Sequence, residues 1–264
     1  MKPRRAGPVH LVDHGGAGVP VLLTHGMAAH SHWWDAVVPH LAGCHAVAMD
    51  FRGHGESEWA ADGAYTSETW TADVAAAADA LGWDRFVLVG HSMGARIALD
   101  FAERRPERLR GLVGVDFLPD FYDSGTRKHE RTRTRPQPVY DSPEPMAEKY
   151  RLQPPGTLLT RDELSALGRK SLRRAESGWT WKFDWRAFTF PYGPVWPQLP
   201  RIPVPSLLVR GELSTIVTDA DLEKMAAAMP AGRAKTVAGA HHHVPLDKPA
   251  ELASVILAFA AELK

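Results

Sequence analysis

The sequence predicts one α/β domain built on a mostly parallel sheet, and three observations lead to this prediction. Short apolar runs alternate with helical patterns near both ends of the chain, as they do in parallel sheets with helical crossovers. The length of 264 residues suits one large domain of this kind. Between the two regions the alternation stops for a stretch too long to be a simple loop, so we expect the domain to carry an insertion.

Apolar runs bounded by glycine, proline or polar residues predict six strands, and apolar spacing near 3.6 predicts the helices between them. The expected strands cover residues 19–26, 44–51, 85–90, 109–117, 204–211 and 234–240. The expected helices of the core cover residues 69–83, 93–109, 219–230 and 249–263. Thr218 is a suitable N-cap for the third of these helices, and Pro249 suits the first turn of the fourth.

The insertion is expected to cover residues 119–200, which leaves 1–118 and 201–264 as the core. It contains four of the nine tryptophans, and its residues 162–176 show the pattern of an amphipathic helix.

Composition excludes several classes of protein. Lys and Arg together number 31, as do Asp and Glu, so no net charge attracts nucleic acid or an anionic membrane. No stretch approaches the roughly 20 apolar residues that span a bilayer. The single cysteine, Cys44, excludes an internal disulfide and suits a reducing compartment. We therefore expect a cytoplasmic protein with no nucleic-acid or membrane partner, whose oligomeric state the sequence leaves open.

The stretch Gly90-His91-Ser92-Met93-Gly94 fits the G-x-S-x-G pattern of a nucleophilic serine. A structural glycine-rich turn is the alternative interpretation. The predicted strand before it and helix after it favour the nucleophile, because such a turn holds the hydroxyl clear of the backbone and above the start of the helix. The first N–H groups of that helix point into the same space and can stabilise an oxyanion.

A serine needs a general base, and the loop after the last predicted strand contains three consecutive histidines, 241–243. We expect one of them to be the base. A metal site is not expected here, because consecutive loop residues point in different directions and no cysteine or carboxylate pattern completes a site. The oxyanion hole is predicted from the backbone N–H groups of Met27 and Met93, although a plain turn after His25 and Gly26 is the alternative for the first.

Four segments in this order resemble the α/β-hydrolase superfamily. They are His25-Gly26, DFRGHGES (50–57), GHSMG (90–94) and GAHHHVPLDKP (239–249). The resemblance implies the α/β-hydrolase fold, with residues 119–200 as a lid between the sixth and seventh strands. It also implies that His242 is the base, because His242 stands five residues before Asp247 and the Lys-Pro pair that follows. His241 stands where many relatives carry a glycine.

The third member of the triad departs from the commonest pattern. Many relatives carry G-x-x-D after the seventh strand, where this chain has a serine at position 214. One branch of esterases takes its acid from the end of the sixth strand and carries G-x-x-S and V-D-x-x-P patterns, which this chain matches at Asp116. The resemblance therefore implies Asp116 as the acid. Glu212 is the alternative acid, and Asp219 is better explained by its place at a helix start.

A Ser-His-acid triad with two N–H donors suits acyl transfer without a cofactor. We expect hydrolysis of a carboxylic ester of a mostly apolar small molecule, with His25, Trp33 and Trp181 as candidate pocket residues. A thioester substrate, acyl transfer or cyclisation in a biosynthetic pathway, and a catalytically silent binding protein remain open as alternatives.

Overall fold

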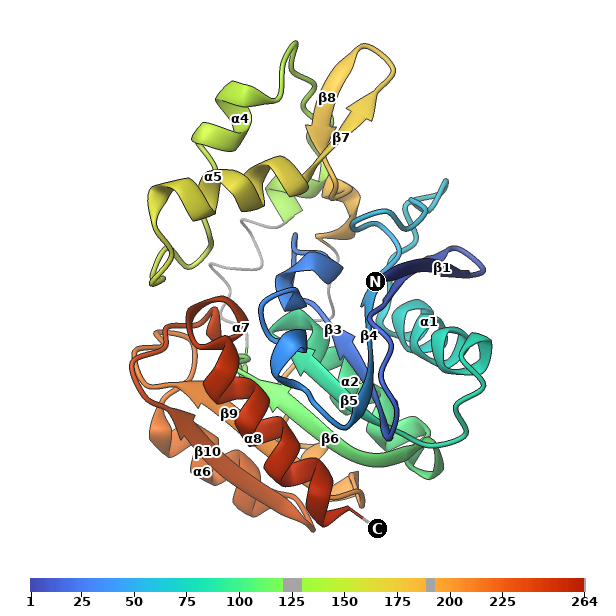
Figure 1. Cartoon of the computed structure of the whole chain (residues 1–264), viewed down its shortest axis with the longest axis vertical. Coiled ribbons are helices and arrows are strands. Elements are labelled where there is room, and N and C mark those ends of the chain that lie inside the picture. Colours follow the sequence, from blue (N-terminus) through green and yellow to red (C-terminus); the bar gives the residue numbers. More distant parts are fainter. Residues whose placement is uncertain (121–129, 189–192, 264) are drawn as a thin grey trace.

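The computed structural model describes residues 1–120, 130–188 and 193–263, and its core is an eight-stranded sheet (Figure 1). The strand order is β1-β2-β4-β3-β5-β6-β9-β10. The strands are β1 Lys2–Ala6, β2 Val9–Asp13, β3 Val19–Thr24, β4 Cys44–Asp50, β5 Phe86–His91, β6 Leu109–Val115, β9 Ser206–Gly211 and β10 Gly232–Val237. Only the pairs β1–β2 and β2–β4 are antiparallel, which confirms the predicted mostly parallel sheet.

The antiparallel hairpin at the start of the chain was absent from the sequence prediction, which named no strand before residue 19. Four of the five residues of β1 are exposed, and its KPRRA sequence has no apolar alternation. Pairing with β2 stabilises this edge strand, and that pairing leaves no period-two signal in the sequence of β1.

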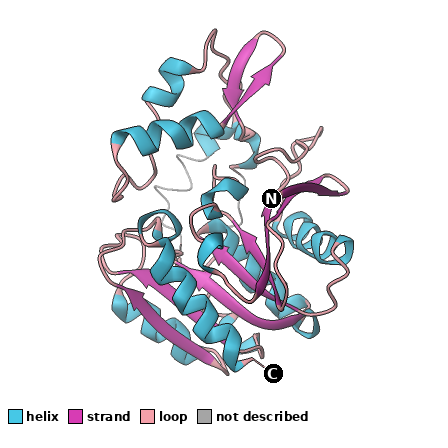
Figure 2. Ribbon diagram, viewed as in Figure 1, coloured by secondary structure: helices cyan, strands magenta, loops and turns pink. Residues whose placement is uncertain are grey.

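Helices cover both faces of the sheet (Figure 2). The helices of the core are α1 Ser67–Ala80, α2 Met93–Arg104, α6 Asp219–Ala228, α7 Val244–Asp247 and α8 Pro249–Glu262. Within β3, Leu22 packs into the cluster that contains residues of α1, α2 and α6, whereas Val21 packs into the cluster that contains residues of α8. The strands are thus apolar on both sides, as buried parallel strands require. Within the described ranges, no helix is both long enough and apolar enough to span a membrane.

Two predicted helices extend too far. The second core helix ends at Arg104 rather than at residue 109, because Pro106 cannot continue it and starts a short 3-10 turn. In the insertion, α5 is Arg161–Lys170 and the chain then forms β7 Leu172–Ala175 instead of continuing to residue 176. Leu172 pairs with Trp181 and is buried beside Met146, so tertiary packing outweighs the helical pattern.

The insertion forms a separate layer. Its described elements are α4 Glu144–Glu148, α5, β7 and β8 Gly178–Trp181, and the β7–β8 hairpin contributes no strand to the main sheet. Figure 1 shows these four elements together at one end of the molecule, apart from the sheet. The backbone N–H of Gly55 donates to Lys182 O and that of Asp184 donates to Gly53 O, so the loop after β4 connects the core to this layer.

Candidate active site

Ser92 lies on a tight turn between β5 and α2. Its φ angle is +54°, which is uncommon for a residue with a side chain, and its N–H donates to Val115 O at 2.8 Å. A Cβ at Gly94 would lie 2.6 Å from His25 O, and one at Gly90 would lie 2.4 Å from Gly94 O. Both flanking glycines are therefore required by close packing. The turn costs about 1–3 kcal/mol of backbone strain, which is typical of functional sites.

Asp116 and His242 form a buried pair. The Nδ1 of His242 donates to Asp116 Oδ1 at 2.8 Å, and the aspartate is 0% exposed. Two further donors hold the carboxylate: the N–H of Gly211 at 2.7 Å from Oδ2 and the hydroxyl of Ser214 at 2.7 Å from Oδ1. Asp116 also has a positive φ of +46°, and its N–H donates to Val209 O at 2.7 Å. Its neighbours thus fix both the backbone and the side chain of the acid.

The environment sets the charges of this pair. Burial raises the pKa of the Asp116 carboxyl to about 6, against the hydrogen bonds from Ser214 and Gly211, which lower it. Burial lowers the pKa of His242 to about 3. At neutral pH the carboxylate is therefore ionised and the imidazole is neutral. This is the protonation state in which a histidine held by an acid can act as a general base.

His91 connects the nucleophile turn to the base. This residue, directly before Ser92, donates its Nε2–H to His242 O at 2.9 Å, and the centroids of the two rings are 4.8 Å apart. The structure therefore places Asp116 in contact with His242, and His242 in contact with His91, the residue before Ser92, at the carboxyl ends of strands of the same sheet.

The loop after β3 lies against the nucleophile. Gly26 lies against Ser92, since a Cβ at Gly26 would be 3.2 Å from Ser92 Cβ. Met27, the next residue in the chain, is therefore at the edge of the site. Met93 is the first residue of α2, where backbone N–H groups have no intrahelical acceptor. Both N–H groups predicted for the oxyanion hole thus belong to segments beside Ser92, and their role in binding an oxyanion stays a prediction.

His25 is 0% exposed and both of its ring nitrogens are used. Its Nδ1 donates to Gly26 O at 2.7 Å, and its Nε2 accepts from Phe51 N–H at 3.1 Å. These bonds connect the loop after β3 to the loop after β4, so the structure places His25 as a support of the oxyanion loop rather than on a pocket surface.

Neither alternative acid lies in the buried pair. Glu212 is exposed, and its Oε2 accepts from Gly239 N–H at 2.7 Å. Asp219 accepts from Arg210 at 2.6 Å and from Thr236 at 3.0 Å.

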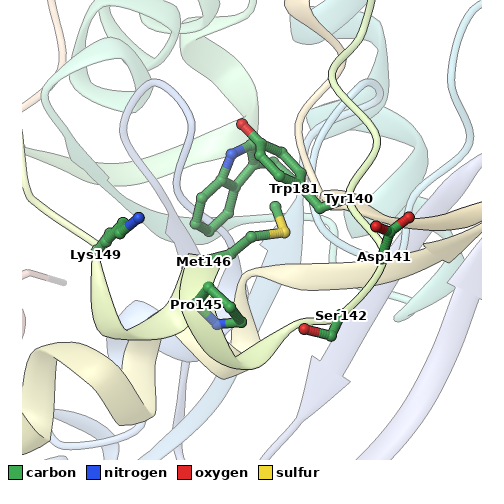
Figure 3. Close-up of a pocket in the computed structure, with 7 residues that line it drawn as sticks. All are labelled: Tyr140, Asp141, Ser142, Pro145, Met146, Lys149 and Trp181. Carbon is green, nitrogen blue, oxygen red and sulfur yellow. The ribbon is translucent and has the colours of Figure 1, made fainter.

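The two candidate pocket tryptophans lie in different places. Trp33 stacks on His91 with ring centroids 5.9 Å apart and meets His243 edge-on at 5.4 Å, so it borders the site. Trp181 belongs to β8 and lines a cavity of about 310 Å³ (Figure 3). The cavity is enclosed by residues of the insertion, Tyr140, Asp141, Ser142, Pro145, Met146 and Lys149. The structure therefore places Trp33, and not Trp181, beside His91 and His243.

Two residues of the site were missed as contributors by sequence reasoning. The sequence uses Ser214 only as part of a pattern, whereas in the structure its hydroxyl donates to the Asp116 carboxylate. The G-x-x-S pattern was the available signal for this contact. His91 carried no signal of its own, because its partner lies 151 residues away in the chain.

Comparisons with known proteins show the family to which this fold belongs. Residues 19–249 match the profile of a family described as alpha/beta hydrolase fold. Esterase Rv0045c of Mycobacterium tuberculosis is 26% identical over 262 residues, covering 96% of this chain and 86% of that protein. Its crystal structure superposes with a TM-score of 0.79 at 28% identity, covering 97% of this chain and 88% of that one. The thioesterase domain from the curacin biosynthetic pathway has a TM-score of 0.79 and 26% identity, covering 97% and 98%. The relatives indicate a hydrolase, and the chain belongs to the α/β-hydrolase family.

Proposed function

We propose that the protein cleaves carboxylic esters of mostly apolar small molecules through an acyl-enzyme on Ser92. The observation that supports this most is the buried Asp116–His242 pair, whose Nδ1–Oδ1 distance is 2.8 Å, beside the strained turn of Ser92. A buried carboxylate that fixes the tautomer of a buried histidine, next to a serine on a strained turn, supports a catalytic role over a binding role.

The chemistry follows from these positions. As Ser92 Oγ attacks the ester carbonyl, Nε2 of His242 takes its proton, and Asp116 stabilises the resulting imidazolium. The carbonyl oxygen becomes an oxyanion that accepts hydrogen bonds from the N–H groups of Met27 and Met93. The intermediate collapses, the C–O bond to the alcohol breaks, and His242 returns the proton to the leaving alkoxide. Water then attacks the acyl-enzyme with His242 again as base, which releases the acid and restores Ser92.

We further propose that the insertion acts as a lid that shapes an apolar substrate site. Trp33 packs with Leu152, Leu164 and Leu167 of the insertion while its ring faces His91 and His243. An aromatic and aliphatic wall next to the catalytic histidines favours an apolar acyl or alcohol group.

A thioester is the second candidate substrate, because a thioesterase domain superposes over 98% of its length. The same nucleophile, base and oxyanion donors serve both substrate classes, so only measured specificity separates them.

The test is hydrolysis of p-nitrophenyl esters from acetate to decanoate, in parallel with the matching acyl-coenzyme A thioesters. We expect ester turnover by the wild type and a fall in kcat of about 10⁶-fold in Ser92→Ala. Ser254→Ala, an exposed serine on α8, is the matched control and should retain full activity. Turnover that survives in Ser92→Ala would exclude the proposed nucleophile, and a preference for the thioesters would select the second candidate.

A further inference from the structure

The site contains two more buried histidines than the proposed reaction uses. His91 is 2% exposed, His242 is 5% exposed and His243 is 1% exposed. One ring nitrogen from each of the three lies within 4.8 Å of the others. His91 comes from the end of β5 and the other two from the loop before α7, so the cluster depends on the fold and not on one run of sequence.

Hydrogen bonds determine which nitrogens carry a lone pair. The Nε2–H of His91 donates to His242 O at 2.9 Å, and the Nε2–H of His243 donates to Pro154 O at 2.8 Å. In a neutral imidazole the other nitrogen is then an acceptor. For both residues that nitrogen, Nδ1, is buried and has no hydrogen-bond partner among the described residues. Each of these two nitrogens therefore has a lone pair with which a ligand can be bound.

The third ring completes the pattern. His242 donates its Nδ1–H to Asp116, which leaves Nε2 with its lone pair. Each of the three rings thus donates one N–H to a carbonyl or a carboxylate and keeps the other nitrogen bare. This is the arrangement that orients histidines which bind metal ions, because the outer hydrogen bond fixes the tautomer and increases the basicity of the ligand nitrogen.

The spacing indicates how such an ion is bound. Zinc–nitrogen bonds of about 2.0–2.1 Å in a tetrahedron place ligand nitrogens about 3.3 Å apart. One ring nitrogen of each histidine lies within 4.8 Å of one nitrogen of each of the others, so the three rings have to rotate to bring their bare nitrogens to this shorter spacing. A site that must contract suits a reversible ligand better than a permanently bound cofactor.

We propose that His91, His242 and His243 bind Zn²⁺ or another late first-row divalent metal ion that prefers imidazole, and that the ion inhibits the enzyme. Inhibition follows because the ion takes the nitrogen with which His242 accepts the proton of Ser92. This second part rests on the proposed function, whereas metal binding does not. The proposed hydrolysis itself uses no metal.

A metal site here differs from the expectation from the sequence, because the consecutive residues His242 and His243 both contribute a nitrogen to one cluster. His241 is outside it, with its N–H donated to Asp247 at 2.9 Å. The third ligand comes instead from His91, which the fold brings from elsewhere in the chain.

The experiment titrates the full-length, metal-free protein with zinc chloride in a calorimeter, with magnesium chloride as the control ion. We expect one zinc ion per chain and no magnesium binding. His91→Gln and His243→Gln should each weaken zinc binding by at least about 10-fold. His241→Gln is the matched control and should bind zinc like the wild type. Thermal melts without metal establish that each variant is folded.

Activity provides the second measurement. Zinc should inhibit ester hydrolysis at the concentration at which it binds, and a chelator should restore the rate. The metal site would be overturned if the wild type did not bind zinc, or if His91→Gln and His243→Gln bound zinc as tightly as the wild type does. This holds even if the ester is hydrolysed. If no ester is hydrolysed but zinc binding is lost in both variants, the metal site stands and the proposed reaction fails.

Discussion

The carboxyl edge of the sheet and the insertion hold their functional groups in different ways. At the sheet edge, backbone hydrogen bonds fix the proposed catalytic residues: Ser92 N–H donates to Val115 O, and Asp116 N–H donates to Val209 O. In the insertion, side chains make several of the contacts with the core, such as the hydroxyl of Tyr65 with Asp184 at 2.6 Å. We therefore expect substitutions where the insertion meets the core to affect the proposed active site less than substitutions at the sheet edge.

The sharpest way to test the sheet edge is to neutralise its acid. Asp116→Asn keeps the size of the side chain but removes the charge that stabilises the imidazolium of His242, so we expect kcat to fall by about 10⁴-fold. Glu212→Gln is the matched control, because its exposed carboxylate bonds to Gly239 N–H instead, and its kcat should change less than about threefold. Both variants are measured on the best p-nitrophenyl ester.

The opposite result would reassign the triad. If Glu212→Gln lost most of its activity and Asp116→Asn kept it, the acid would come from the end of β9. The hydrogen bond between Asp116 and His242 would then be structural.

These two acids also show what the sequence can predict. The sequence assigns Ser92 and His242 as nucleophile and base because strand ends of a parallel sheet meet at one edge and because each lies within a recognisable motif, and both roles stay predictions. Asp116 was assigned through the resemblance to an esterase branch. The contacts of Ser214 and His91 depend on distances between separate strand ends, which no local pattern records.

For the fold, too, the sequence predicts elements that have a local pattern and misses elements that depend on distant partners. The core helices and parallel strands were predicted from periodicity, with ends displaced by a few residues. The exposed strand β1 and the hairpin that begins with β7 were missed, because pairing partners rather than local pattern stabilise them.

A smaller effect is expected from pH. The Asp116 carboxyl, whose pKa burial raises to about 6, must be ionised and His242 neutral for the reaction, so uptake of one proton by the pair removes activity. We expect kcat/KM to fall about tenfold for each pH unit below about 6. A rate profile from neutral to acidic pH measures this, with circular dichroism to show that the protein stays folded.

A substitution of Ser214 tests whether Asp116 is the group that controls the acidic limb of the pH profile. The hydrogen bond from the Ser214 hydroxyl lowers the pKa of Asp116, so Ser214→Ala should move the acidic limb of the profile to higher pH. A limb at the same pH in this variant would mean that another group controls the rate.

The smallest effect is expected where the insertion meets the core. The hydroxyl of Thr157 donates to Asp247 Oδ1 at 2.6 Å and accepts from Leu159 N–H at 3.2 Å. Thr157→Val removes both bonds but leaves the one from Leu158 N–H to Asp247 at 2.9 Å. The free energy of unfolding, measured by urea denaturation, should fall by about 1 kcal/mol. Because the sheet edge fixes the catalytic residues, kcat should change less than about threefold, and Thr157→Ser should restore stability. A loss of kcat near that of Asp116→Asn would show that the insertion, and not the sheet edge alone, holds the catalytic geometry.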